Sequence, residues 1–117
     1  MIGKDAYVGR HTRLTAVGGT LTLADRANLS TWVRLTARQN LSIGAKTLLG
    51  PHGALEDLPG APITIGSNVW LGASVTVAPG VTVGDDTVVG TAARIETSLP
   101  PRVIAVGRPA RVIKERG

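Results

Sequence analysis

The sequence predicts an all-β fold, a parallel β-helix of about five coils followed by a short C-terminal tail. Fifteen aliphatic residues recur at near-six-residue intervals and sort into three columns of five, with no polar residue at any place in the array. A hexapeptide period of this kind is typical of coils with three short strands, each of which points one aliphatic side chain inward. The columns are Ile2, Leu23, Ile43, Ile65, Val83; then Val8, Leu29, Leu49, Leu71, Val89; then Leu14, Leu35, Leu55, Val77, Ile95.

The motif itself is repeated, which is the second observation behind the fold. I-T-I-G-S-N-V-W-L-G at residues 63–72 restates L-S-I-G-A-K-T-L-L-G at 41–50 and V-T-V-G-D-D-T-V-V-G at 81–90. From these copies, each coil is expected to hold one strand around each of its three column residues. The predicted coils run over residues 2–14, 23–35, 43–55, 65–77 and 83–95.

The irregular spacings all fall between one coil and the next. Column residues within a coil are six apart, but the step from the third column to the next first column is nine, eight, ten and six residues. The extra residues therefore leave the prism at one edge, within segments 15–22, 36–42 and 56–64. Insertions in repeat proteins gather on one face, often the binding face, so function is expected beside coils one to three.

Composition limits the classes of protein to consider. The 117 residues fit one domain, and the absence of Phe suits a narrow interior filled by Val, Ile and Leu. There is no Cys, so neither a disulfide framework nor a thiol nucleophile is available. No apolar run approaches the roughly 18 residues of a membrane span, and Met1 opens directly onto the first repeat without a signal-peptide pattern. We expect a cytoplasmic protein.

Positive charge is concentrated in the tail. Residues 1–100 carry eight Lys and Arg against seven Asp and Glu, whereas residues 101–117 carry five against one, so the tail supplies +4 of the net charge of +5. A compact basic cluster suits a phosphate-bearing ligand, and the alternative is a solvated cationic tail. Nucleic acid is not expected, because the chain has one Tyr, two Trp and no long basic stripe with interleaved aromatic residues.

Residues 1–100 are expected to form the β-helix and residues 101–117 a separate capping segment. Pro100-Pro101 interrupts the repeat, because proline cannot donate a hydrogen bond to a strand ladder. The tail beyond is expected to be extended, to end in a helical turn and to cover one exposed end of the solenoid. Because the insertions crowd one edge, the other edges are flat and can pack against further copies, which predicts a homotrimer.

The run at 63–114 resembles the C-terminal half of hexapeptide-repeat acyltransferases, especially the maltose, galactoside and polysaccharide O-acetyltransferases. The motifs that carry the resemblance are V-W-L-G at 69–72, P-G-V-T-V-G at 79–84 and G-R-P-A-R-V-I-K at 107–114. The resemblance implies a left-handed β-helix, a homotrimer, acetyl-CoA as acyl donor, and active sites in the clefts between neighbouring prisms.

The resemblance also implies cofactor-binding residues. The matching positions are Trp70, Gly72, Ala73, Gly90, Thr91, Arg111 and Lys114. In the family the first three line the cleft near the pantetheine arm, the next two lay their backbone along that arm, and the last two contact the nucleotide phosphates. Structural alternatives stay open: the glycines serve the coil corners, Trp70 packs in a trimer contact, and the two basic residues are solvated.

Two departures from the family pattern concern catalysis. The usual Thr-Lys pair after the last repeat is Glu96-Thr97 in this chain, which removes a positive charge near the cofactor. The family's general base is a His on the loop before the W-I-G coil. The corresponding loop here, E-D-L-P-G-A-P at residues 56–62, contains no His.

His11 and His52 are the only histidines. Both occupy the fourth place of a second-column hexapeptide, with Trp32 at the equivalent place between them, so they are expected to stack on one side about 10 Å apart. Two His per chain do not make a three-His zinc site, and no metal is expected. His52 is the candidate general base, with Glu56 or Asp57 to orient it. The alternative is a corner histidine without catalytic duty.

Two functions follow. The first is a CoA-dependent O-acetyltransferase that acts on a hydroxyl of a sugar, a saccharide or another acceptor. The second is a catalytically silent trimeric scaffold, which includes a truncated or engineered acetyltransferase-like protein. The missing loop His favours the scaffold, whereas Trp70 and the basic tail favour the enzyme.

Overall fold

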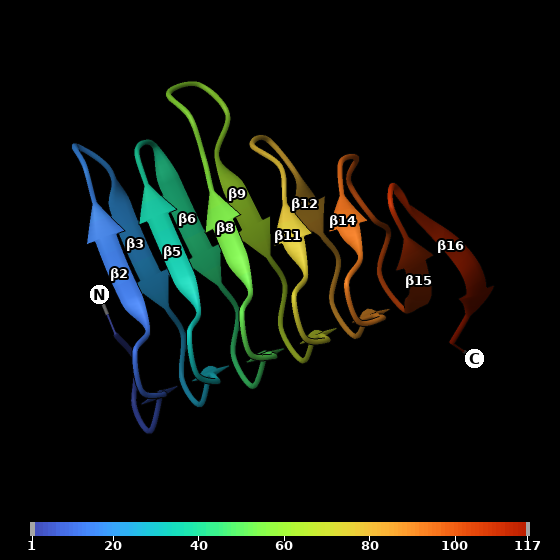
Figure 1. Cartoon of the computed structure of the whole chain (residues 1–117), viewed down its shortest axis with the longest axis horizontal. Helices are drawn as coiled ribbons and strands as arrows, with labels where there is room; N and C mark the ends of the chain where they lie inside the picture. Colours follow the sequence, from blue (N-terminus) through green and yellow to red (C-terminus); the bar gives the residue numbers. More distant parts are fainter. Residues whose placement is uncertain (1, 117) are drawn as a thin grey trace.

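The computed structural model describes residues 2–116 as a β-solenoid, and it confirms the predicted fold class (Figure 1). Within these residues sixteen strands form three sheets, here called faces 1, 2 and 3. Face 1 consists of β3 (Thr20–Leu23), β6 (Asn40–Ile43), β9 (Ile63–Ile65) and β12 (Thr82–Val83). Face 2 consists of β1 (Tyr7–Val8), β4 (Asn28–Leu29), β7 (Leu48–Leu49), β10 (Trp70–Leu71), β13 (Val88–Val89), β15 (Val103–Gly107) and β16 (Ala110–Glu115). Face 3 consists of β2 (Arg13–Ala16), β5 (Arg34–Ala37), β8 (Ala54–Glu56), β11 (Thr76–Val77) and β14 (Arg94–Ile95).

The three aliphatic columns form the core, as predicted. From the second coil onward every column residue is buried, because each parallel strand places its column residue directly over that of the coil below. In the first coil Ile2 is 58% exposed and Val8 38% exposed, since these residues lie at the outer edge of the stack. The first coil therefore belongs to the pattern without contributing fully to the core.

Two of the three prism corners turn through non-glycine residues with positive φ. At the corner between faces 2 and 3, here called corner 2–3, the turn residues have φ between 59° and 64°. They are His11, Trp32, His52, Ser74 and Ala92. The repeated left-handed turn stacks residues of equal position in successive coils, so this corner carries one outward column along the whole prism.

The insertions leave the prism at the corner between faces 3 and 1, as the spacing predicts. The connections between β2 and β3, β5 and β6, and β8 and β9 all project on one side of the molecule, and the β8–β9 loop extends furthest (Figure 1). In that loop Leu58 pairs with Ala61 in an isolated antiparallel bridge around Gly60, whose φ is +79°. The longest loop thus folds back on itself.

The C-terminal segment continues face 2. β15 pairs in parallel with β13, and β16 returns antiparallel along β15, so the tail covers the outer edge of this sheet at the C-terminal end (Figure 1). The expected helical turn is wrong, because β16 runs as a strand to Glu115. Leu99 and Ala105 are buried and six residues apart, and they add a sixth member to the first and second columns, with the two prolines between them. The division at residue 100 stays a prediction.

Candidate active site

Corner 2–3 brings together five of the residues predicted from the sequence. Gly72 and Ala73 follow β10, and Gly90 and Thr91 follow β13, at the same corner as His52 in the preceding coil. Backbone hydrogen bonds link these coils: the N–H of Ser74 donates to Pro51 O at 2.8 Å, and that of Ala92 to Ala73 O at 2.7 Å. The candidate base and the candidate pantetheine contacts therefore share one edge of the prism.

The glycines of this corner have a structural role. A Cβ on Gly72 would lie 2.8 Å from the backbone N of Thr91, and a Cβ on Gly50 would lie 2.7 Å from that of Ala73. Real Cβ atoms do not approach backbone so closely, so glycine is what allows successive coils to stack here. This accounts for Gly72 without any ligand and leaves its cofactor contact as a prediction.

The backbone N–H groups of Ala73 and Thr91, which lie at this corner, have no hydrogen-bond acceptor within residues 2–116. At the corner between faces 1 and 2 the equivalent N–H groups of Lys4 and Ser67 donate to the carboxylates of Asp25 and Asp85, at 2.7 and 2.8 Å. Corner 2–3 therefore offers donors to a bound molecule, whereas these two N–H groups of the neighbouring corner are satisfied within the chain.

His52 is exposed and forms part of an aromatic stack, as the repeat positions predict. The His11 and Trp32 ring centroids are 4.3 Å apart with 15° between the planes, and those of Trp32 and His52 are 6.3 Å apart with 7° between the planes. The two histidines thus lie on opposite faces of one indole. The stack fixes the orientation of the imidazole from one side only.

Neither predicted carboxylate is held against His52 within the chain. Asp57 is buried and accepts the backbone N–H groups of Arg38, of Gln39 at 2.9 Å and of Asn40 at 2.7 Å, which closes the turn between β5 and β6. Glu56 is exposed and forms an ion pair with Arg38. Both carboxylates lie toward the opposite end of β8 from His52, so their expected orienting role finds no support in these contacts.

Trp70 lies on the outer surface of face 2. The register places it between Leu48 and Val88, and 58% of its surface is exposed. It lines a surface hollow together with Asn68, Val88 and Arg116. The indole is thus available to a ligand or to another subunit, as the two alternatives from the sequence require.

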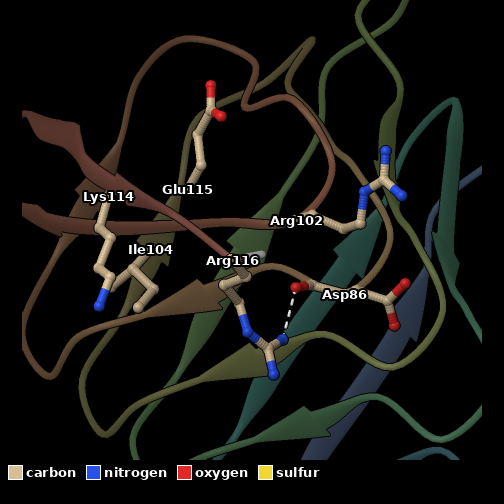
Figure 2. A pocket seen from close by; sticks show the side chains of 6 residues that line it. All are labelled: Asp86, Arg102, Ile104, Lys114, Glu115 and Arg116. Atoms are coloured by element: carbon tan, nitrogen blue, oxygen red, sulfur yellow. Dashed lines mark hydrogen bonds between the residues drawn. The ribbon is translucent and has the colours of Figure 1, made fainter.

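Lys114 lines a second hollow on the same face, next to the tail hairpin. Figure 2 shows it beside Ile104, with Arg102 and Arg116 on other sides of the hollow and Asp86 between them. The guanidinium of Arg116 donates to the backbone oxygen of Asp86 at 2.6 Å (Figure 2). Arg116 lines both hollows, so it stands between Lys114 and the site of Trp70.

Arg111 is placed differently from Lys114. It pairs with Val106, whose Cγ1 lies 2.9 Å from the position of a Cβ on Gly90. The two predicted phosphate contacts therefore flank the hairpin: Arg111 lies toward corner 2–3 and Lys114 in the hollow with Arg102 and Arg116. The sequence alone does not group Arg102 and Arg116 with Lys114, because only strand pairing shows which tail residues share a hollow.

Two further features bear on the class of the protein. Across residues 2–116 no group of three or more His, Asp or Glu side chains is placed to hold a metal ion. The same part of the chain contains no helix of the length and apolar character needed to cross a membrane.

Comparison with known proteins assigns the family. The family model described as "Bacterial transferase hexapeptide (six repeats)" matches residues 62–97. WcaF of Escherichia coli (strain K12), provisionally named as a colanic acid biosynthesis acetyltransferase, is 36% identical over 126 residues, which cover 98% of this chain and 69% of WcaF. The chain belongs to the hexapeptide-repeat acyltransferase family. The predicted resemblance is thereby confirmed.

Two other relatives of this hexapeptide-repeat protein are galactoside acetyltransferases. Galactoside O-acetyltransferase of Escherichia coli (strain K12) is 52% identical over 54 residues, which is 46% of this chain and 27% of that enzyme. The solved structure of a galactoside acetyltransferase in complex with coenzyme A has a TM-score of 0.87 and is 30% identical, with 99% of this chain and 64% of that chain covered. The likeness confirms the left-handed β-helix.

Proposed function

We propose that this protein is a CoA-dependent O-acetyltransferase that acts on a hydroxyl of a saccharide, with acetyl-CoA as donor. Its relatives include a galactoside O-acetyltransferase and a protein assigned to colanic acid biosynthesis, and a galactoside acetyltransferase with the same fold binds coenzyme A. These relatives support both the donor and the acceptor class.

The observation that carries the proposal is the chemistry of corner 2–3. The N–H groups of Ala73 and Thr91 lack acceptors within residues 2–116, and the exposed imidazole of His52 belongs to the same corner, one coil from Ala73. Free N–H donors and an imidazole at one corner are what acyl transfer needs: a base for the hydroxyl and donors for the oxyanion.

His52 then acts as the general base. Its imidazole takes the proton of the acceptor hydroxyl while that oxygen bonds to the carbonyl carbon of the thioester. The N–H of Ala73 donates to the carbonyl oxygen as it gains negative charge. When the carbon–sulfur bond breaks, the imidazolium returns the proton to the leaving thiolate, which yields the acetyl ester and free CoA.

The donor is bound by the C-terminal half of the prism. Gly72, Gly90 and Thr91 offer backbone to the pantetheine arm, and Trp70 walls the cleft. Arg111 and Lys114 contact the phosphates, and the hollow around Lys114 adds Arg102 and Arg116 to this cationic set. A guanidinium or ammonium group binds phosphate through charge-assisted hydrogen bonds, so this end of the molecule suits the nucleotide.

The assembly that completes the site is a homotrimer, and the chain works in the cytoplasm. Trp70 is exposed, and its two neighbours in face 2, Leu48 and Val88, are apolar and partly exposed, which suits a cleft closed by a second prism. Light scattering at micromolar concentration is expected to give about three times the chain mass of 12.1 kDa. A stable monomer would contradict the trimer.

One observation favours a second function, the silent scaffold. No carboxylate orients His52 within residues 2–116, and the 56–62 loop has no His to replace it. The two functions differ in turnover but not in CoA binding. Incubation with acetyl-CoA and a saccharide panel, followed by mass spectrometry, is expected to show addition of one acetyl group. CoA binding without any acetylated product would select the scaffold.

A further inference from the structure

Two arginines lie side by side on face 3. The tetrapeptide R-L-T-A occurs at 13–16 and again at 34–37, and β2 pairs with β5 so that Arg13 is directly opposite Arg34. Both side chains are exposed. Like charges directly opposite each other on neighbouring strands are destabilising, so the stability of the sheet does not explain this pair of arginines.

No carboxylate within residues 2–116 forms an ion pair with either of these arginines. The ion pairs found within residues 2–116 are Arg38–Glu56 and Arg94–Glu96, so Arg13 and Arg34 have no carboxylate partner there. Arg10, exposed at corner 2–3 in the first coil, has none either. By contrast, the cations at the corner between faces 1 and 2 share one hollow with two carboxylates, those of Asp5 and Asp25.

An aromatic stack adjoins the arginines. His11 precedes Arg13 by two residues and Trp32 precedes Arg34 by two residues. The aromatic stack and the pair of arginines therefore run side by side over the first two coils. Trp32 is 54% exposed although its φ is 62°, a conformation that bulky residues rarely adopt. The fourth and fifth coils turn at the same corner with Ser74 and Ala92, so the fold itself does not require aromatic residues here.

Backbone donors add to the positive character of this surface. The N–H groups of Arg10 and Thr31, like those of Ala73 and Thr91 further along corner 2–3, have no acceptor within residues 2–116. Side-chain guanidinium groups and unpaired backbone N–H groups are both donors that an anion accepts from.

We propose that Arg10, Arg13, Arg34 and Trp32 form a binding surface for an anionic, carboxylate-bearing saccharide, which makes the acceptor an acidic glycan. Arginine suits carboxylates because its planar fork binds them through two hydrogen bonds. His52 ends the same stack, so an acceptor sugar at the base extends over Trp32 toward the arginines. This inference rests on the proposed function, because it names the acceptor of that site.

The aromatic stack disfavours single-stranded nucleic acid as the ligand. Nucleic-acid bases are held by stacking on open aromatic faces. A ring already lies on each side of Trp32, that of His11 on one side and that of His52 on the other.

The test compares an oligogalacturonate with its fully methyl-esterified form and with oligo-dT, each titrated into the protein by calorimetry. The free acid is expected to bind, with affinity that falls as salt is raised, and the ester and the oligonucleotide at least about tenfold more weakly. The double variant R13Q/R34Q is expected to lose at least about tenfold in affinity for the free acid. The matched variant R26Q/K46Q, which removes two positive charges at the other corner, is expected to bind as the wild type does.

Three results would overturn the proposal: equal binding of acid and ester, tighter binding of the oligonucleotide, or equal losses in the two variants. Thermal unfolding of both variants checks that each is folded, and the single substitutions R13Q and R34Q replace the double variant if it is not. Titration of CoA into the wild-type protein tests the proposed transferase separately from the acidic acceptor. Normal CoA binding and turnover of neutral saccharides without oligogalacturonate binding would refute the acidic acceptor alone, whereas oligogalacturonate binding without any turnover would refute the transferase.

Discussion

The imidazole of His52 lies parallel to the indole of Trp32, with 6.3 Å between the ring centroids and 7° between the planes. The contact leaves the other face of the imidazole uncovered by any ring within residues 2–116. One side of His52 is thus fixed by the fold, and the other faces the place where donor and acceptor meet in the proposed site.

Replacement of His52 tests its role as base. Because loss of a positioned general base removes about 10²–10⁴-fold in rate, His52→Ala is expected to lower kcat by that factor while CoA affinity and trimer mass stay unchanged. His11→Ala removes the other histidine of the same stack and is the matched control. Equal activity of the wild type and His52→Ala would exclude the assignment.

Asp57 is expected to act on stability rather than on the reaction. Its buried carboxylate accepts three backbone N–H groups, and Asp57→Ala leaves them unpaired, so the free energy of unfolding should fall by about 2–3 kcal/mol. Glu56→Ala removes an exposed ion pair and should cost less than about 1 kcal/mol. Urea denaturation measures both. An Asp57→Ala variant with full stability and reduced kcat would instead support the role of Asp57 in orienting His52.

The five coils could be predicted from the sequence, because a short period in the aliphatic residues determines the strands of a solenoid, whereas the tail hairpin of β15 and β16 could not. The coil order, the edge that takes the insertions and the stacking of His11, Trp32 and His52 all follow from counting residues. The sixth members of two columns, Leu99 and Ala105, are not evident from the sequence, because Pro100 and Pro101 lie between them and interrupt the repeat. Prolines end a regular ladder, but parallel pairing resumes as soon as an N–H is available.

The site could be predicted less well, because its contacts depend on neighbours far apart in the sequence. Asp57 is close to His52 in the chain, yet a strand separates them and turns the carboxylate toward Gln39 and Asn40. The pairing of Arg13 with Arg34 was visible as a repeated R-L-T-A, but its significance depends on the absence of nearby carboxylates. Charge totals over 100 residues average out a local excess of this kind.

Substitution of Gly72 tests whether this glycine is required for coil stacking or for cofactor binding. A Cβ at this position meets the backbone of Thr91 at 2.8 Å, so Gly72→Ala is expected to lower the free energy of unfolding by about 1–3 kcal/mol even without ligand. Gly53→Ala is the control. A Cβ on Gly53 would have its nearest atom 3.4 Å away, and the equivalent positions of three other coils hold Val33, Val75 and Ala93. That substitution should be neutral or stabilise by up to about 1 kcal/mol. Similar denaturation midpoints for the two variants would refute the steric account.

The tail cations are expected to bind the phosphates of CoA. Substitution of Arg111 and Lys114 together by Ala should weaken CoA binding by about tenfold and reduce its salt dependence, because charge-assisted hydrogen bonds are lost. Arg26→Ala with Lys46→Ala removes the same charge at the corner between faces 1 and 2 and should leave CoA affinity unchanged. Calorimetry measures the CoA affinity of both double variants. Equal CoA affinities of the two variants would show that the nucleotide does not bind at Arg111 and Lys114.

Release of CoA from acetyl-CoA tests the central claim most directly. The chain has no Cys, so a thiol reagent added to the reaction reports only the sulfur of the released CoA. With saccharide acceptors present, the wild-type protein is expected to generate thiol at a rate that rises with acceptor concentration and that falls by about 10²-fold or more in His52→Ala. A wild-type rate equal to the hydrolysis of acetyl-CoA in buffer, across neutral and acidic saccharides, would contradict the transferase.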